Sequence, residues 1–209
     1  MPTRIFHITH INNLPLILES GGLIAKSQLL KSSARHLDIS YESVQGWRSR
    51  KAVPCGARGV VHDYVPFYFA PRSPMLYTIH KGNVANYQGG QRPILHLVTT
   101  IEEIHAQELS FVFTDGHAIM DYSDFYDDLG LLDEVIDWQV MKSQYWYDTD
   151  EDPNRKCKRQ AEFLVHQFFP WHLITEIGAI DPAIQTQVNV ILQSSQCETP
   201  VRVYRNWYY

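Results

Sequence analysis

Residues 155–171 read RKCKRQAEFLVHQFFPW, and this stretch passes from four cations through a single acid, Glu162, into an apolar run. Successive side chains of a strand point to opposite faces, so AEFLVH would place Glu162, Leu164 and His166 on one face. The other face would be wholly apolar: Ala161, Phe163 and Val165. The pattern predicts a buried strand with a carboxylate at its mouth. It leaves open whether Glu162 meets solvent, pairs with a nearby cation or begins a functional face.

Short strands of this kind recur along the chain. Runs of β-branched and aromatic residues predict strands near residues 3–9, 64–70, 93–99, 110–115, 161–166, 175–180 and 201–205. Capping residues and helix formers predict helices near residues 14–20, 38–51, 73–80, 101–106 and 181–195. Few strands are joined by a helical crossover, so we expect an α+β fold of mixed or largely antiparallel sheets with flanking helices. Residues 118–160 show weak regular structure over a long stretch, which is typical of a functional segment.

The length and composition bound the kind of protein. A chain of 209 residues with 44% hydrophobic and 20% charged residues is typical of one globular domain, here residues 1–209. No apolar run approaches the roughly 20 residues of a membrane span, and MPTRIFHITH lacks the build of a signal peptide. We therefore expect a cytoplasmic protein without a membrane partner. The three cysteines have no CxxC spacing, so neither a disulfide framework nor a cysteine zinc site is indicated.

Charge is distributed unevenly along a chain whose net charge is −5. One basic patch comprises Arg48, Arg50, Lys51 and Arg58, and a second comprises Arg155, Lys156, Lys158 and Arg159. Between them, residues 121–152 carry eleven acids against one lysine. A lone charged run is usually a solvated face. Two basic patches on an acidic chain favour a local anionic ligand, such as a phosphate or a nucleic-acid strand.

Common catalytic motifs are missing from the sequence. HITH at residues 7–10 falls at a strand end, where side chains three apart point to opposite faces, so a metal site is not expected there. GARG at 56–59 and QGGQ at 88–91 match neither the GxGxxG nor the GxxxxGK[ST] pattern. No GxSxG nucleophile elbow occurs either. The sequence therefore does not indicate a Rossmann or P-loop nucleotide site, a serine hydrolase or a metal enzyme.

Four ordered motifs carry a resemblance to a known family. They are IFHITHINNLPLILESGGLIA (5–25), YVPFYFAPRSPMLYTI (64–79), FVFTDGHAI (111–119) and QAEFLV (160–165). Together they resemble the DarT family of bacterial toxins, DNA ADP-ribosyltransferases that are distant relatives of the poly(ADP-ribose) polymerases. The resemblance implies a mixed, largely antiparallel two-sheet core with flanking helices, in which NAD lies in a cleft. It also implies transfer of ADP-ribose to ring N3 of a thymine in single-stranded DNA, with release of nicotinamide and without a metal.

The resemblance further implies roles for particular residues. Glu162 would be the catalytic acid, because a carboxylate on the ribose hydroxyl stabilises the oxocarbenium ion left when nicotinamide departs. Arg48 would be the essential arginine, with Arg50 as the alternative two residues on. It would assist deprotonation of thymine, and its cation is suited to stabilising the resulting anion or to holding the phosphates of NAD. The residues expected around NAD are His7, Ile8, Thr9, Leu16, Ile24, Arg48, Met75 and one stacking aromatic, Tyr68 or Phe69.

Contacts with DNA and with a partner are also implied. His117 and Arg50 would contact the acceptor strand, and Arg155, Lys158 and Arg159 would bind its phosphates just before Glu162. Simple solubility is the alternative explanation of these cations. A macrodomain antitoxin that removes the modification is expected by family analogy. A related transferase acting on protein or RNA, and a non-enzymatic DNA-binding module, stay as alternatives at this point.

Overall fold

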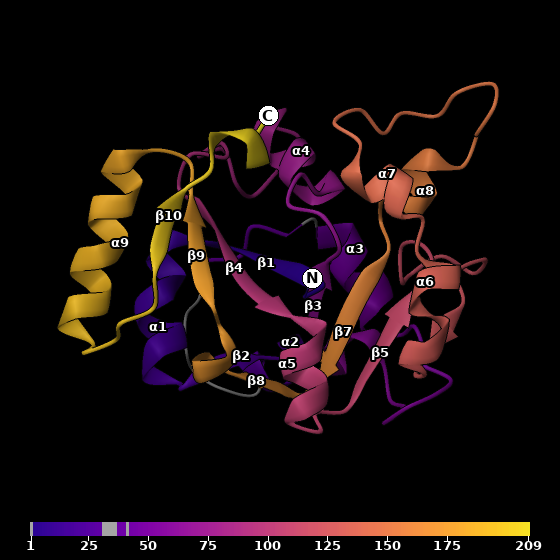
Figure 1. Cartoon of the computed structure of the whole chain (residues 1–209), viewed down its shortest axis with the longest axis horizontal. Coiled ribbons are helices and arrows are strands. Elements are labelled where there is room, and N and C mark those ends of the chain that lie inside the picture. The colour runs from indigo at the N-terminus through magenta and orange to yellow at the C-terminus, as the bar shows by residue number, and fades with distance from the viewer. Residues whose placement is uncertain (1, 31–36, 41) are drawn as a thin grey trace.

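The computed structural model describes residues 2–30, 37–40 and 42–209 (Figure 1). Its strands are β1 (Arg4–His10), β2 (Gly22–Ile24), β3 (Tyr64–Tyr68), β4 (Ile94–Thr100), β5 (Phe111–Thr114), β6 (Phe125–Tyr126), β7 (Glu162–His166), β8 (Phe168–Pro170), β9 (Glu176–Ala179) and β10 (Val201–Val203). Its helices are α1 (Leu14–Glu19), α2 (Lys26–Leu29), α3 (Glu42–Arg48), α4 (Pro74–His80), α5 (Ile101–Ala106), α6 (Leu132–Val135), α7 (Trp138–Lys142), α8 (Arg155–Lys158) and α9 (Pro182–Ser194). None of the helices in these residues is long and apolar enough to cross a bilayer.

Most strands belong to one sheet, in the order β10-β9-β4-β1-β3-β7-β5-β6. Only the β10–β9 pair is parallel among the described strands of this sheet, and its other neighbours are antiparallel. β2 and β8 form a separate antiparallel pair. In Figure 1, α9 flanks the β9–β10 end of the sheet and α6 to α8 flank the β5–β7 end. The expected α+β class with a largely antiparallel sheet is confirmed.

The sheet is nearly divided in two between β1 and β3. These strands face each other at one pair, Phe6 opposite Tyr68, whereas β1 pairs with β4 over its whole length and β3 pairs fully with β7. Beyond that pair the imidazole Nδ1 of His7 donates to the carbonyl oxygen of Pro66 across the gap, at 2.8 Å. Pro66 has no N–H, and a strand tolerates this where its edge has no partner. The expected two-sheet core therefore takes the form of two four-stranded halves that diverge and leave a cleft.

β7 shows the alternation that the sequence predicts. Phe163 and Val165 are fully buried in the main core with Phe67 of β3, and Leu164 lies in a smaller cluster on the opposite face. Glu162 shares the face of Leu164 and is only 1% exposed. The alternative that Glu162 is a strand-end acid in solvent is therefore wrong. Burial of a carboxylate requires a partner for its charge.

Local signals account for most of the element boundaries. The Ser73 hydroxyl accepts a hydrogen bond from the backbone N–H of Leu76, so Ser73 caps α4 as expected. The sequence patterns missed β2 and β8, which have three residues each and form only by pairing with one another. Their approach explains Gly22, because a Cβ there would clash with the carbonyl oxygen of Phe169. β2 packs against α1, which precedes it in the chain.

Acidification is expected to destabilise the fold through His96, a fully buried residue of β4. Its Nε2 donates to the carbonyl oxygen of Pro71, and burial lowers its pKa to about 4. The unfolded chain binds this proton below pH 6.5, so the stability contributed by neutral His96 is complete above that pH and is lost as the pH falls toward 4. The expected loss between pH 7 and pH 5 is about 2 kcal/mol.

Urea unfolding at pH 7 and pH 5 measures this effect. His96→Asn, which cannot titrate, should lose less stability on acidification than the wild-type chain. His105→Asn removes an exposed histidine of α5 and serves as the matched control. Equal losses for wild type and His96→Asn would contradict the prediction.

Candidate active site

Two adjoining cavities lie in the cleft between β1 and β3. We call the larger, about 430 Å³, the carboxylate cavity, and residues of β1, β3, α3, α4 and β7 line it, among them His7, Ile8, Arg48, Tyr68, Met75 and Glu162. We call the smaller, about 180 Å³, the apolar cavity, and it extends toward α1 and β2, where Thr9, Leu16 and Ile24 contribute to its walls. Some residues line both, including His7, Ile8 and Arg48. The two cavities thus offer one elongated ligand more than one environment.

A buried ion pair forms the wall of the carboxylate cavity. Arg48, the last residue of α3, donates through Nη1 to both carboxylate oxygens of Glu162, at 3.0 Å to Oε1 and 2.8 Å to Oε2. The two side chains are 9% and 2% exposed. Removing one partner of such a pair leaves an uncompensated buried charge, which typically costs 3–5 kcal/mol. The first basic patch therefore supplies the counter-charge of Glu162 through Arg48 and not through Arg50.

The segment after β5 holds Glu162 in place. The backbone N–H of Ala118 donates to Oε1 of Glu162 at 3.3 Å. The Thr114 hydroxyl accepts from the backbone N–H of Glu162 at 3.1 Å and donates to the carbonyl oxygen of Gly116 at 2.6 Å. Thr114 is fully buried, and these two bonds join β7 to the loop that carries His117 into the carboxylate cavity. In the described part of the chain, Oε2 accepts one hydrogen bond, from Arg48, and keeps a lone pair for a ligand hydroxyl.

Replacing Thr114 with valine is expected to lower kcat more than it changes KM. Valine has nearly the same shape but leaves the Glu162 N–H and the Gly116 carbonyl buried without a partner, at about 1–3 kcal/mol each. Both Glu162 and the 116–118 loop should then shift. Initial rates at varied substrate concentration measure the effect. Thr114→Ser keeps the hydroxyl and should restore kcat, whereas equal losses in both variants would assign Thr114 a purely packing role.

Arg48 also has an atom that lacks a protein partner. Its Nη2 is buried and makes no hydrogen bond in the described part of the chain. A buried donor left in this state costs about 1–3 kcal/mol, and a bound acceptor would remove that cost. Arg48 as a whole is 7% exposed and lines both cavities. Nη2 is therefore a buried donor that is placed to bind a ligand oxygen.

Burial sets the protonation of the neighbouring side chains. Burial lowers the pKa of His7 to about 4, and because Pro66 offers only an acceptor, Nδ1 carries the proton and Nε2 keeps a lone pair. Burial also lowers the pKa of His117, whose Nδ1 accepts from the Ile119 N–H at 3.4 Å, so its Nε2 carries the proton. The pKa of Tyr68 is raised, first by burial and then by the charge of Glu162. All three side chains are therefore neutral near pH 7.

The structure places nearly all the residues expected around NAD at the cavity walls: His7, Ile8, Thr9, Leu16, Ile24, Arg48, Tyr68 and Met75. Their individual roles stay predictions. Phe69 cannot be the stacking aromatic that was expected as one of two choices. The residue is 5% exposed, and its ring packs edge-on against Trp138 and Phe163 in the core. Adjacent strand residues point to opposite faces, so Tyr68 and Phe69 could not both face the cleft. Tyr68 is the aromatic of that pair available to a ligand.

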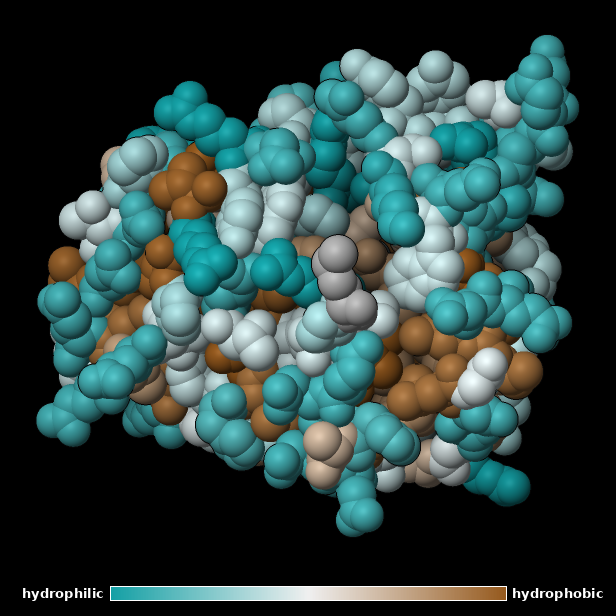
Figure 2. Space-filling model, viewed as in Figure 1, coloured by the Kyte–Doolittle hydropathy of each residue, from teal (hydrophilic) through white to brown (hydrophobic). Residues whose placement is uncertain are grey.

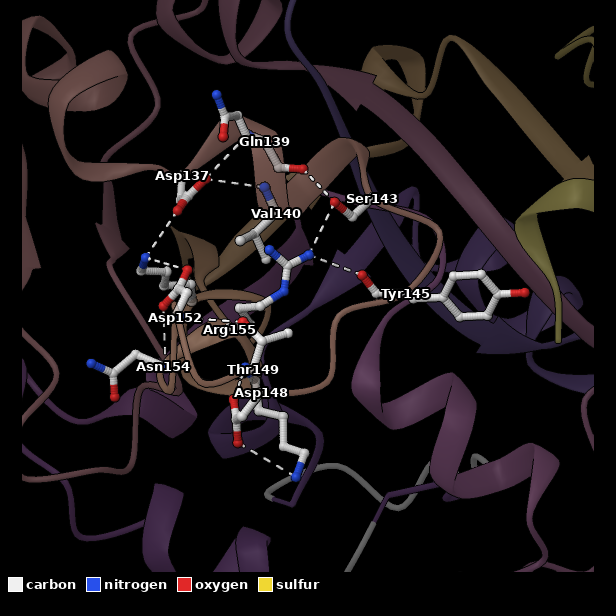
Figure 3. Close-up of polar contacts among 12 residues, drawn as sticks. Asp137, Gln139, Val140, Ser143, Tyr145, Asp148, Thr149, Asp152, Asn154 and Arg155 are labelled. Carbon is white, nitrogen blue, oxygen red and sulfur yellow. Dashed lines mark hydrogen bonds and ion pairs between the residues drawn. The ribbon is translucent and has the colours of Figure 1, made fainter.

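The second basic patch does not form the open phosphate site that was expected. Lys158 pairs with Asp137 at 3.0 Å and with Asp152 at 2.8 Å, and its hydrogen bond to Asp152 raises its pKa (Figure 3). Arg155 donates through Nη2 to the Ser143 hydroxyl at 3.2 Å and to the Tyr145 carbonyl oxygen at 3.1 Å (Figure 3). These cations hold the acidic segment that precedes them. Arg155 and Lys158 are therefore bound within the protein and are not the open phosphate contacts that were expected.

Arg159 is the clearest departure from the expectation. It is 3% exposed, and its guanidinium donates to the backbone carbonyl oxygens of Arg72, Val140, Met141 and Ser143. Burial lowers its pKa to about 10. Its assignment as a DNA contact is therefore wrong. Arg159 instead joins the end of α7 to the segment just before α4.

Two members of the first patch lie outside the cavity. The Arg50 guanidinium lies 5.4 Å from the ring centre of Trp47, which is 60% exposed. Lys51 donates to the Met120 carbonyl oxygen and pairs with Asp121, both at 3.0 Å, and so ties the end of α3 to the loop after His117. Arg50 is thus placed at the surface beside the site, and its contact with DNA stays a prediction.

The motif FVFTDGHAI did not by itself indicate the role of Thr114. A threonine at a strand end two residues before a glycine is the pattern of a side-chain-to-backbone turn, and this signal was available. In the described part of the chain, no group of three or more His, Cys, Asp or Glu residues is placed to hold a metal ion. The expectation that no metal takes part stays a prediction.

Comparison with known proteins relates this geometry to a family. The profile described as "ssDNA thymidine ADP-ribosyltransferase, DarT" matches residues 6–209. A protein of Thermus aquaticus named "DNA ADP-ribosyl transferase" is 48% identical over 100% of this chain and 90% of its own length. A protein of the same name from Mycobacterium tuberculosis is 33% identical over 90% of this chain and 81% of its own length.

Solved structures agree with the sequence comparison. A Thermus sp. 2.9 DarT described as "in complex with ADP-ribosylated ssDNA" is similar at a TM-score of 0.92 and 44% identity, covering 100% of this chain and 97% of that one. The same protein described as "in complex with NAD+" gives a TM-score of 0.89 at 42% identity, covering 100% and 98%. A Thermosipho africanus DarTG, 19% identical, shares the fold at a TM-score of 0.79, covering 99% and 51%.

Proposed function

The chain belongs to the DarT family of single-stranded-DNA thymidine ADP-ribosyltransferases, and from this premise we propose how its own residues carry the reaction. The protein is an NAD-dependent enzyme that transfers ADP-ribose to thymine in single-stranded DNA and releases nicotinamide. The observation that carries the assignment of residues is the buried Arg48–Glu162 pair on the cavity wall. A non-enzymatic DNA-binding module would have no use for this arrangement.

The residues present fit NAD as the substrate. The buried Nη2 of Arg48 lacks an acceptor, Glu162 Oε2 keeps a lone pair and His7 Nε2 is an unprotonated acceptor. Apolar side chains of Leu16 and Ile24 continue the site into the apolar cavity. NAD supplies the glycosidic bond between nicotinamide and ribose that breaks in the reaction. The polar atoms suit the hydroxyls and phosphates of NAD, and the apolar cavity suits one of its flat rings.

Glu162 stabilises positive charge. Its Oε2 accepts a hydrogen bond from a ribose hydroxyl, and its charge lies close to the sugar on which cationic character develops. The carboxylate is fixed by Arg48 and by the Ala118 N–H, so it needs no reorientation during the reaction. Its desolvation strengthens the electrostatic effect. The cation of Arg48, 2.8 Å away, supplies the counter-charge of the carboxylate in this buried place.

Arg48 and His117 act on the acceptor base. A guanidinium holds its protons tightly and is a poor base, so we assign the cation of Arg48 to stabilising thymine as ring N3 gives up its proton to solvent water. The buried Nη2 of Arg48 has two N–H bonds, so one can donate to NAD and the other to a thymine oxygen. His117 lines the same cavity with Nε2 protonated, and it donates to a carbonyl oxygen of thymine. Two donors at one base disperse the negative charge that N3 acquires before it bonds to the ribose.

The experiment incubates purified protein with NAD and single-stranded oligonucleotides and measures their mass. An oligonucleotide with one thymidine should gain one ADP-ribose, whereas the same sequence without thymidine should not. An oligonucleotide with 3-methylthymidine, whose N3 is blocked, should also remain unmodified. A mass gain on protein or RNA but not on DNA would contradict the substrate. A gain on 3-methylthymidine would contradict the choice of N3.

A macrodomain antitoxin in the cytoplasm is the partner proposed for this toxin. Support comes from a Thermosipho africanus relative named "DNA ADP-ribosyl transferase-DNA ADP-ribosyl glycohydrolase fusion protein", which is 24% identical over 88% of this chain and 44% of its own length. There, transfer and removal reside in one chain. A macrodomain encoded next to this protein should strip the mass gain from the modified oligonucleotide. A neighbour without that activity would contradict the pairing.

A further inference from the structure

A third cavity of about 1280 Å³ opens away from the cleft. We call it the cationic groove. It lies among the start of β1, the 138–144 segment and the C-terminal residues 205–209. Figure 1 shows these parts around one region, and Figure 2 shows the same face recessed there between hydrophilic side chains. Its lining includes five cations, Arg4, Arg72, Lys142, Arg159 and Arg205, against one described carboxylate, Asp133. On a chain with a net charge of −5, this is a local reversal of sign.

Three of these cations have donors to offer. Lys142 and Arg205 are exposed and make no ion pair in the described part of the chain. Arg72 lies with its guanidinium 4.3 Å from the ring centre of Tyr209, and its Nε is buried without a hydrogen-bond partner. Asp133 already accepts from the indole N–H of Trp138 at 2.8 Å. Arg4 pairs with Glu176 at 3.3 Å, and Arg159 is enclosed by carbonyl oxygens. The other three cations of the groove have little internal neutralisation, which is suited to a polyanion.

The groove and the carboxylate cavity lie on opposite faces of the same elements. Tyr68 and Gln160 line the cavity, whereas their neighbours Phe69 and Arg159 line the groove. α4 runs between the two: its Pro74, Met75 and Thr78 line the cavity, and Pro71 and Arg72 just before it line the groove. A helix with its side chains is about 10–12 Å across. An extended strand of a few nucleotides can cross that distance.

Aromatic side chains form a ridge along this crossing. Tyr77 of α4, 39% exposed, lies 5.8 Å from Trp146 and 5.0 Å from Tyr209, between ring centres. The indole N–H of Trp146 donates to the Tyr209 hydroxyl at 3.0 Å, and that hydroxyl donates to the Arg72 carbonyl oxygen at 2.9 Å. We call Tyr77, Trp146 and Tyr209 the aromatic ridge. It leads from the rim of the cavity to Tyr209, which lines the groove.

We propose, on the premise of the proposed function, that the single-stranded DNA carrying the modified thymidine crosses the aromatic ridge and lays its phosphates in the cationic groove. Single strands bind where bases can stack on a ring and phosphates can pair with cations. Here Tyr77 is the exposed ring of the ridge, and Trp146 and Tyr209 are half-buried beside it. Arg72, Lys142 and Arg205 provide the phosphate contacts that the second basic patch does not provide. Tyr77 provides a ring face for a base between the two sites.

The test compares oligonucleotides of about 20 and about 5 nucleotides, each with one thymidine, since single-strand sites span about 4–16 nucleotides. Lys142→Gln with Arg205→Gln should raise KM for the long substrate roughly tenfold while leaving kcat and the rates on the short substrate unchanged. Two lost phosphate contacts should also reduce the slope of log KM against log salt by about 1.4, at roughly 0.7 per contact. Arg92→Gln with Lys156→Gln removes the same charge elsewhere and should leave KM unchanged.

A second variant tests the ridge. Tyr77→Ala should raise KM for the long substrate, and Tyr77→Phe, which keeps the ring, should restore it. A long-to-short ratio equal to that of the wild type in both the groove and the ridge variants would overturn the proposal. Loss of the same size in the control pair would also overturn it, because the effect would then be one of net charge. If the wild-type enzyme modified no oligonucleotide of either length, the proposed function itself would fail, which is a separate outcome.

Discussion

Glu162→Gln is expected to reduce the rate of ADP-ribose transfer by about 10²–10³-fold, the effect typical of removing one preorganised electrostatic stabiliser. Glutamine has the shape of glutamate and still accepts a hydrogen bond from Arg48 Nη1. It has no charge to oppose the positive charge that develops on the ribose. The measurement is the rate at which a thymidine oligonucleotide gains mass at saturating NAD.

Stability must be followed in the same variant. Loss of the carboxylate leaves Arg48 as a buried cation without its partner, and breaking such a pair typically costs 3–5 kcal/mol. Glu162→Ala would add a cavity to this cost, so glutamine is the sharper substitution. Circular dichroism should show a folded chain with a lowered melting temperature. A folded Glu162→Gln variant with the wild-type rate would remove Glu162 from the mechanism.

Arg48→Lys is expected to lower transfer by roughly 10²-fold although the charge is kept. An ammonium can pair with Glu162, but it has no second nitrogen at the position of Nη2, where a ligand oxygen would bind. The two Nη atoms of arginine can bind Glu162 and the ligand oxygen at once, whereas the single ammonium of lysine can bind only Glu162 in this geometry. The fold should tolerate this change better than Glu162→Gln, because the buried carboxylate keeps a cation.

Arg50→Ala is the matched comparison for Arg48. The guanidinium of Arg50 lies over the exposed Trp47 outside the cavity, so its loss should raise KM for DNA and leave kcat nearly unchanged. The ratio of the two effects on kcat decides between the two arginines. A larger fall in kcat for Arg50→Ala than for Arg48→Lys would show that Arg50 is the essential arginine, the alternative that the sequence left open.

Much of the fold follows from local pattern. The alternation in AEFLVH predicts both faces of β7, and the cap at Ser73 marks the start of α4. These features depend on neighbours within a few residues, which the sequence displays. The short β2 and β8 were missed because each exists only through the other, across more than a hundred residues. A strand of three residues has too little pattern of its own to be recognised.

In the candidate site, too, the sequence indicated some features, and others depend on tertiary contacts. Family resemblance brought Glu162 and Arg48 into consideration and also named both Tyr68 and Phe69, although alternation on one strand allows only one of them to face the cleft. Residue patterns alone did not show that Glu162 is buried, that Thr114 anchors it or that Arg159 is enclosed by carbonyl oxygens. Each of these depends on contacts between distant segments.

By itself, the sequence determined the α+β class, the order of the longer helices and strands, the face on which Glu162 lies and the family to which the chain belongs. Only the tertiary structure decided which charges meet. Arg48 and Glu162 are 114 residues apart and pair because α3 and β7 converge on the cleft, whereas the cations before Glu162 are taken by the acidic segment. The reason is physical: backbone periodicity is set over a few residues, but a buried charge is stabilised only by the partner that packing brings within hydrogen-bond distance.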